Sequence, residues 1–255
     1  MTATPAGITY ADYLALDELL AAQRPLSTLH DEMLFIVIHQ TKELWLKQML
    51  HELTLATGLV REDRFSPAYK ALARVSRIQS VMTLSWDVLA TLTPVDYSAF
   101  RNVLGTSSGF QSAQFREFEY RLGLKDPAYL AHYPSDGSLH AALRAALDEP
   151  SLRDEAHDAL QRAGFDLGDR SEAAFGDAWL QVYREPDRWF ELYQLAEKLV
   201  DIDDALASWR HKHVLTVERI IGNKPGTGGS SGAAYLRSTL GKRVFPELWA
   251  MRTAL

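Results

Sequence analysis

One histidine lies in the middle of an apolar stretch, LFIVIHQTKELW, which runs from Leu34 to Trp45. Phe35 precedes His39 by four residues, so a helix would place the two rings on one face. An imidazole beside an aromatic wall can hold a flat ligand through one directional hydrogen bond, and the pair therefore indicates a binding pocket. A core histidine whose ring nitrogens find partners explains the same pattern, and the sequence does not separate the two interpretations.

A second histidine, His213, shares a helix face with Trp209 one turn before it and Val217 one turn after it. His211 is two residues away, where a regular helix points the side chain to nearly the opposite side, so the two cannot chelate one ion. Because the chain has no cysteine, an imidazole on an apolar face is the natural axial ligand for a haem iron. A buried core histidine is the alternative.

Two further segments carry groups suited to a charged ligand. In VDYSAFRNVLG, Tyr97 and Arg101 are four residues apart, and the planar guanidinium suits a carboxylate, although an exposed amphipathic turn explains the spacing equally well. The stretch GNKPGTGGSSG, residues 222–232, has the composition of a flexible linker but lies between two expected helices. Its glycines favour a close backbone approach to a ligand, with the Thr227 hydroxyl available, and its composition also suits a mobile lid.

Several other kinds of site are excluded by residue type and spacing. No histidine has a glutamate three positions before it, which excludes the paired Glu-x-x-His pattern of a carboxylate-bridged di-iron bundle. The His-Glu-x-x-His zinc pattern and the glycine-rich nucleotide-binding patterns are missing. Without cysteine there is no disulfide framework, thiolate nucleophile or iron–sulfur cluster.

The overall composition is that of an ordinary globular protein, with 47% hydrophobic and 24% charged residues in 255. A net charge of -6, with dispersed positive charges, argues against binding to nucleic acid or to an anionic membrane. The first residues do not read as a signal peptide, and no apolar run approaches the length of a membrane span. We therefore expect a cytoplasmic protein with a single domain over residues 1–255.

Helical periodicity dominates the elements that must position these side chains. We expect a long helix capped by Asp31 and running to Val60, then a second over 66–92 that Pro94 breaks. A third is framed by glycines at 109 and 123, and long helices return over 172–185 and 187–222. From Lys125 to Asp169 the helices look shorter and more polar, and we expect a variable helical excursion over about 125–187. No run alternates long enough for a strand, so the fold class is all-α, a large helical bundle.

Four stretches together resemble one family, tryptophan 2,3-dioxygenase, a haem enzyme that opens the indole ring of L-tryptophan. They appear in the family's order and spacing and cover nearly half of the chain. The stretches are TYADYLALDELLAAQRPLS, HDEMLFIVIHQTKELWLKQMLHEL, FRNVLGTSSGFQSAQFREFEYRLG and WRHKHVLTVERIIGNKPGTGGSSGAAYLRSTLGKRVFPELW.

This resemblance implies a haem b cofactor, active in the ferrous state, with L-tryptophan and O2 as substrates. The product would be N-formyl-L-kynurenine, from the first step of tryptophan degradation by the kynurenine pathway. It also implies a homotetramer, a dimer of dimers, in which the N-terminal segment 1–30 of one subunit reaches over the pocket of its neighbour. Tyr10, Tyr13 and Leu14 match the residues that do so.

The resemblance also implies a role for each matching residue. His213 corresponds to the haem iron ligand, and His39 to the distal histidine that hydrogen-bonds the indole N–H of the substrate. Arg101 corresponds to the partner of the substrate carboxylate. The remaining matches line the same site: Phe35 and Tyr97 as aromatic walls, Thr227 at the ammonium and carboxylate end of the substrate, and Ser108 and Gly109 beside the haem.

Some positions depart from the family pattern, and two other functions stay open. Thr106 and Ser107 replace a common Pro-Ala pair, and Lys42 stands at a variable position near the distal histidine. The first alternative is a haem-dependent monooxygenase of a substituted indole, which the amino-acid-binding pair Arg101 and Thr227 disfavours. The second is a haem-binding sensor without turnover, which would have no use for that pair. A purely structural helical protein ranks last.

Overall fold

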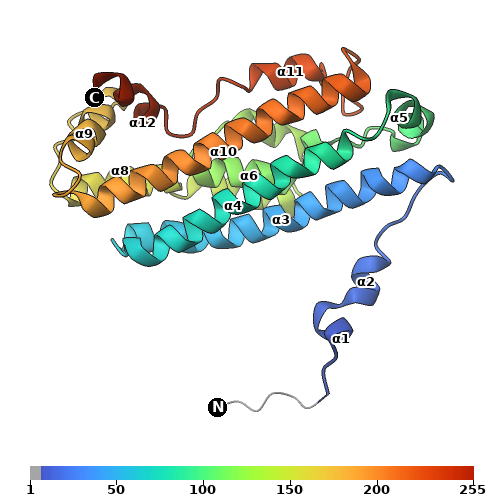
Figure 1. The fold of residues 1–255 in the computed structure, drawn as a ribbon, viewed down its shortest axis with the longest axis horizontal. Helices are drawn as coiled ribbons and strands as arrows, with labels where there is room; N and C mark the ends of the chain where they lie inside the picture. Colours follow the sequence, from blue (N-terminus) through green and yellow to red (C-terminus); the bar gives the residue numbers. More distant parts are fainter. Residues whose placement is uncertain (1–6) are drawn as a thin grey trace.

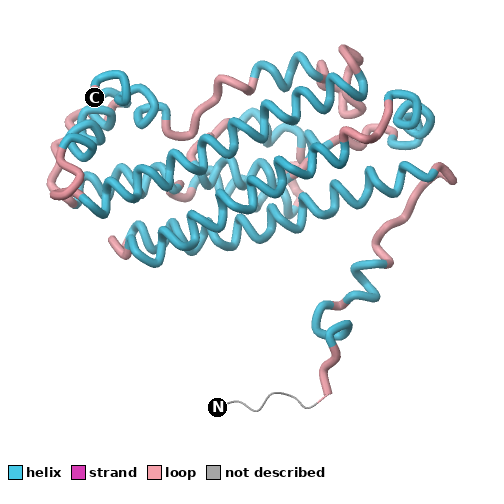
Figure 2. The backbone as a smooth tube through the Cα atoms, in the orientation of Figure 1, coloured by secondary structure: helices cyan, strands magenta, loops and turns pink. Residues whose placement is uncertain are grey.

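The structure is a computed structural model that describes residues 7–255. Across that range it contains twelve α-helices and four short 3-10 helices and no β-strand, which confirms the all-α prediction (Figures 1 and 2). The α-helices are α1 (Tyr10–Leu14), α2 (Leu16–Leu20), α3 (His30–Arg61), α4 (Phe65–Leu89), α5 (Pro94–Phe100), α6 (Ala113–Leu122), α7 (Ser138–Asp148), α8 (Leu152–Arg162), α9 (Glu172–Arg184), α10 (Phe190–Ile221), α11 (Ala233–Ser238) and α12 (Pro246–Ala250). The 3-10 helices are η1 (Arg101–Leu104), η2 (Gly109–Gln111), η3 (Pro127–His132) and η4 (Met251–Ala254).

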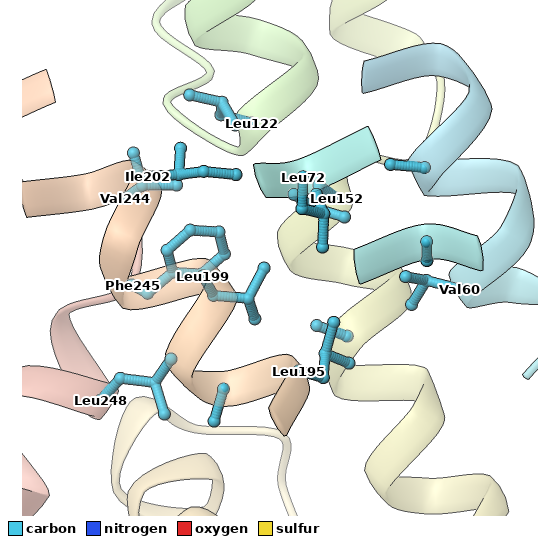
Figure 3. Packing of buried hydrophobic residues seen from close by; sticks show 14 of the residues in the cluster. Val60, Leu72, Leu122, Leu152, Leu195, Leu199, Ile202, Val244, Phe245 and Leu248 are labelled. Carbon is cyan, nitrogen blue, oxygen red and sulfur yellow. The ribbon is translucent and has the colours of Figure 1, made fainter. Parts of the chain in front are cut away.

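Three long helices, α3, α4 and α10, form the frame of the molecule and run side by side, with α4 packed along both of the others (Figure 1). Their inner faces bury a large apolar cluster that Figure 3 shows from close by, including Val60, Leu72 and Leu199. Leu152 of α8 and Trp179 of α9 bury their side chains in the same cluster. None of the helices found between residues 7 and 255 is long and apolar enough to cross a membrane.

The ends of the long helices differ from the sequence predictions in two places. Asp31 does not cap α3, because the helix begins at His30 and its N-cap residue is Leu29. The carboxylate at this end that binds backbone belongs instead to the buried Glu32, which accepts the N–H groups of Leu26 at 2.7 Å and Ser27 at 2.8 Å. The prediction that Asp31 caps this helix was therefore wrong, although a neighbouring carboxylate does bind the backbone there.

The break after α4 also has a different form from the one predicted. The helix ends at Leu89, and Pro94 does not end it but occupies the first turn of α5. Proline is favoured there because its missing N–H would have no partner in the first turn of a helix. Thr93 caps α5 by accepting the N–H of Asp96 at 3.2 Å. This short helix delivers Tyr97 and, directly after its end, Arg101.

The first helices form an arm that leaves the bundle, as Figure 1 shows for α1 and α2. Tyr10 and Tyr13 are each 76% exposed and Leu14 is 40% exposed. Residues 1–6, which belong to the predicted N-terminal segment 1–30, lie outside the described residues. The aromatic side chains of this arm therefore make little contact with the rest of their own chain.

Candidate active site

A cavity of about 240 Å³ opens between α3, α4 and α10 and is bordered by the segment after α10. His39 of α3 and His213 of α10 both line it. Its walls are largely apolar, which suits a flat organic ligand held by a few directed polar groups. The apolar lining residues include Leu46, Met82, Trp86, Leu89, Leu92, Phe115, Trp209, Ile220 and Ile221.

The hydrogen bonding of His39 defines which of its ring nitrogens faces a ligand. Nδ1 lies 2.7 Å from the carbonyl oxygen of Phe35, and because a carbonyl only accepts, Nδ1 carries the proton. The ring is tilted by 39° against that of Phe35, with 4.2 Å between the centroids. Burial lowers the pKa of His39 below its ordinary value, which favours the neutral ring. Nε2 of His39 is then a hydrogen-bond acceptor for a ligand N–H.

His213 is held by two indole rings. Its imidazole stacks on Trp86, with 4.3 Å between centroids and 11° between planes, and Trp209 lies 5.0 Å away. Burial lowers the pKa of His213 to about 3, with smaller contributions from Lys42 and His39. A neutral imidazole is the form that binds a metal ion.

The neighbouring histidine has a different environment. His211 is exposed, and its Nδ1 donates to the carbonyl oxygen of Ala207 at 2.8 Å. The two-residue spacing therefore separates the side chains as a regular helix requires. Only His213 of this pair lines the cavity.

The glycine-rich segment 222–232 is fastened to the chain after α5 at two points. The guanidinium of Arg101 donates to the carbonyl oxygen of Pro225, and the Thr227 hydroxyl donates to the carbonyl oxygen of Ser107 at 2.5 Å. A guanidinium has five N–H donors and a hydroxyl has two lone pairs, so both side chains keep capacity for a ligand. Thr227 is part of the cavity lining, whereas Arg101 is not and reaches the glycine-rich segment through Pro225.

Close packing explains the glycine at position 228. A Cβ atom there would lie 2.6 Å from the Cβ of Ser108, a distance that real side chains do not tolerate. The segment 222–232 therefore approaches the chain around Ser108 as closely as a backbone can. Ser108 and Gly109 both line the cavity at this border.

A buried cluster of charged side chains forms another part of the lining. Glu119 of α6 accepts from Arg210 of α10 at 2.8 Å and also from Arg116, and all three side chains are buried. Two guanidinium groups share one carboxylate, so the cluster carries an excess of positive charge. An anion entering the neighbouring cavity would stabilise this excess of buried positive charge.

Comparisons with known proteins bear on this site. The family model described as tryptophan 2,3-dioxygenase matches residues 1–164 and 140–255, and so spans the whole chain. A protein of Caulobacter vibrioides named tryptophan 2,3-dioxygenase is 61% identical, over 97% of this chain and 98% of its own length. Proteins of that name from Bacillus cereus and Bordetella parapertussis are 54% and 52% identical, each over 97% of this chain and over 93% and 91% of their own lengths.

The chain belongs to the tryptophan 2,3-dioxygenase family. This confirms the family resemblance inferred from the sequence. Proteins of the tryptophan 2,3-dioxygenase family cleave tryptophan with dioxygen, and this chain is an enzyme of that kind.

The haem that the resemblance implies can be tested against the lining of the cavity. Of the nine buried side-chain nitrogen and oxygen atoms that lack a hydrogen-bond partner within residues 7–255, five belong to lining residues. These five are Lys42 Nζ, Trp86 Nε1, Arg116 Nε, Trp209 Nε1 and Thr216 Oγ1. Unpartnered polar atoms are rare in protein interiors, and these five line a cavity that has neutral imidazoles and apolar walls. The residues present therefore fit a haem with its negatively charged carboxylates.

Most of the side chains that the sequence singled out come together at this cavity. Those that line it are Phe35, His39, Tyr97, Ser108, Gly109, His213 and Thr227, with Arg101 directly beside them. Tyr10, Tyr13 and Leu14 do not join them among the described residues of this one chain, because they lie on the arm formed by α1 and its neighbour α2.

Sequence reasoning missed several polar and aromatic residues of the lining, among them Trp86, Arg116, Glu119 and Arg210. The ion-paired residues Glu119 and Arg210 are 91 positions apart, and no local spacing relates them. Arg116 lies within the third expected helix, where no spacing sets it apart. Trp86 could have been noticed as the one large aromatic near the end of its helix, but only the fold places it against His213.

Proposed function

We propose that this chain is a haem-dependent dioxygenase that adds both atoms of O2 across the indole C2–C3 bond of L-tryptophan, giving N-formyl-L-kynurenine. The observation that carries the proposal is that one cavity holds two histidines whose imidazoles have different contacts. His213 is neutral and stacks on the indole of Trp86, whereas His39 presents a hydrogen-bond acceptor. An axial ligand and a substrate acceptor are the two roles that such a reaction needs from the protein.

His213 is proposed as the residue that holds the haem iron, with Ser108 and Gly109 beside the haem. When bound, the haem supplies the binding of O2 and the oxidation of the indole ring. The protein contributes orientation, a dry apolar cavity and the placement of protons. Trp86 and Trp209 fix the orientation of the His213 ring. A substitution at either position is therefore expected to change how His213 binds the iron.

The zwitterionic end of tryptophan is proposed to bind at the border between the segment after α5 and the glycine-rich segment 222–232. Arg101 has free N–H donors for the carboxylate, and the Thr227 hydroxyl, which already donates to Ser107, keeps lone pairs that accept an ammonium N–H. Tyr97 is buried against the ring of Phe35, with 5.9 Å between their centroids. These two rings form the aromatic wall beside which the indole lies.

His39 is proposed as the acceptor of the indole N–H through Nε2. Its Nδ1 donates to the carbonyl oxygen of Phe35, so the neutral ring is held in one orientation and Nε2 is left to accept from the substrate. An indole N–H is a very weak acid, which favours a positioning role over proton abstraction. His39 therefore holds the substrate in place, while the oxidation itself depends on the haem.

The Michaelis constant for tryptophan is expected to rise as the pH falls below the lowered pKa of His39. Protonation turns Nε2 into a donor that faces the donor of the indole, and because burial lowers the pKa, the neutral form persists through the ordinary histidine range near about 6.5. The Michaelis constant measured between mildly acidic and neutral pH tests this. His39→Ala should reduce activity without abolishing it and should lose the acidic rise; an equal rise in that variant would assign it to another group.

The homotetramer is part of the proposal and is supported by the arm formed by α1 and α2. Tyr10, Tyr13 and Leu14 are exposed on it, and they match the residues with which relatives reach a neighbouring subunit. We propose that they complete the pocket of another copy of this chain. Light scattering of the purified protein measures the assembly directly.

The proposed function is tested by adding L-tryptophan to the reduced haem-loaded protein. Under anaerobic conditions the absorption spectrum of the haem should shift as the substrate binds, and tryptophan should be consumed once air is admitted. A spectral shift without consumption would instead describe a sensor, and no haem binding at all would contradict the assignment of His213.

A further inference from the structure

Lys42 is a buried lysine in the lining of the cavity. It lies on α3 one turn after His39, and only 7% of its surface is exposed. Its Nζ is 2.8 Å from the centroid of the Trp86 ring. Among residues 7–255 this nitrogen has no hydrogen-bond partner.

The indole face does not satisfy this ammonium group. A ring attracts a cation through its quadrupole, but it offers no lone pair to the three N–H donors of lysine. Burial alone lowers the pKa of Lys42 to about 6, because no carboxylate lies close enough to offset it. A buried charge without a partner is costly, and such groups in native proteins pair with an ion or a ligand.

The carboxylates that line the same cavity are already engaged. Glu43 accepts from the side chain of Gln114 at 2.7 Å, and Glu119 is shared by Arg116 and Arg210. Lys42 lines the same cavity as His39 and His213. Any counter-charge must therefore come from a molecule that enters this space.

We infer that Lys42 is an anion-binding residue that pairs its ammonium group with an anionic oxygen brought into the cavity by the prosthetic group. This inference rests on the proposed function, because it takes a haem as the occupant. Two sources share the chemistry: a side-chain carboxylate of the haem, or an anion bound to its iron. In either case Lys42 is a charged partner of the cofactor and does not exchange protons with the substrate.

The first arm of the test measures how fast the ferric haem leaves the protein for excess apomyoglobin. Lys42→Met keeps the length of the side chain and removes the charge, with Lys42→Gln as a second variant should the first not fold. Lys47→Met, at an exposed position of the same helix, is the matched control. A carboxylate partner predicts at least about tenfold faster loss for the Lys42 variants only, and equal rates for all proteins loaded with haem dimethyl ester.

The second arm measures the affinity of the ferric protein for fluoride. An iron-bound partner predicts weaker fluoride binding in the Lys42 variants, by at least about tenfold, with Lys47→Met unchanged. Unaltered haem loss and unaltered fluoride affinity in the Lys42 variants would overturn the inference. Failure of the unsubstituted protein to bind haem would contradict the proposed function instead, so the two failures are distinguishable.

Discussion

Haem binding is expected to be lost when His213 is replaced by alanine. The neutral imidazole lines the cavity, stacked on Trp86 with Trp209 beside it, and alanine has no atom that can bind iron. We expect the haem content of the purified variant to fall to a small fraction of that of the unsubstituted protein. Absorbance of the haem per chain, measured after loading and gel filtration, gives the result.

Two controls separate ligation from a general effect on folding. His211→Ala removes an exposed imidazole from the same helix, and its haem content should be unchanged. His213→Gly should regain haem when imidazole is added to the solution, because the small ligand can occupy the space of the side chain. An unaltered ferrous spectrum in His213→Ala would contradict the assignment.

Replacing Arg101 by alanine should weaken the binding of L-tryptophan by about 1.5–3 kcal/mol, which is roughly ten- to 150-fold. This is the usual cost of losing a hydrogen bond to a charged group, here the one to the substrate carboxylate. The Michaelis constant and the dissociation constant from spectral titration measure it. Both should rise together, since the carboxylate is bound before and during the reaction.

Arg101 also donates to the carbonyl of Pro225, so its removal loosens the segment 222–232. Tryptamine, which lacks the carboxylate, distinguishes the two effects. If Arg101 binds the carboxylate, Arg101→Ala should bind tryptamine about as well as the unsubstituted protein does. Equal losses for tryptophan and tryptamine would show that the residue acts only by fastening the segment.

Patterns within one helix were predictable because they depend on periodicity alone. The long helices α3 and α10, the shared face of Phe35 and His39, and the separation of His211 from His213 all follow from 3.6 residues per turn. The cap of α3 was not predictable from residue type. Asp31 has the right chemistry near the right place, but the turn before the helix is stabilised by Glu32, which reaches back to Leu26 and Ser27.

Contacts between distant parts of the chain could not be read from local spacing. Lys42 and Trp86 meet because α3 and α4 pack together, and Trp86 meets His213 because α10 packs along the other side of α4. The family resemblance named the matching site residues, but it was silent about a lysine at a variable position. The roles of Tyr10 and Tyr13 depend on a second subunit and stay a prediction.

The mass of the product tests the central claim most directly. The haem-loaded, reduced protein is mixed with L-tryptophan under 18O2, and the product is weighed by mass spectrometry. The proposed reaction predicts the mass of tryptophan plus two labelled oxygen atoms, both from the gas. A product with one labelled oxygen would contradict dioxygenation, and unchanged tryptophan in a haem-loaded protein would contradict the assignment of His39 and His213 to a reaction site.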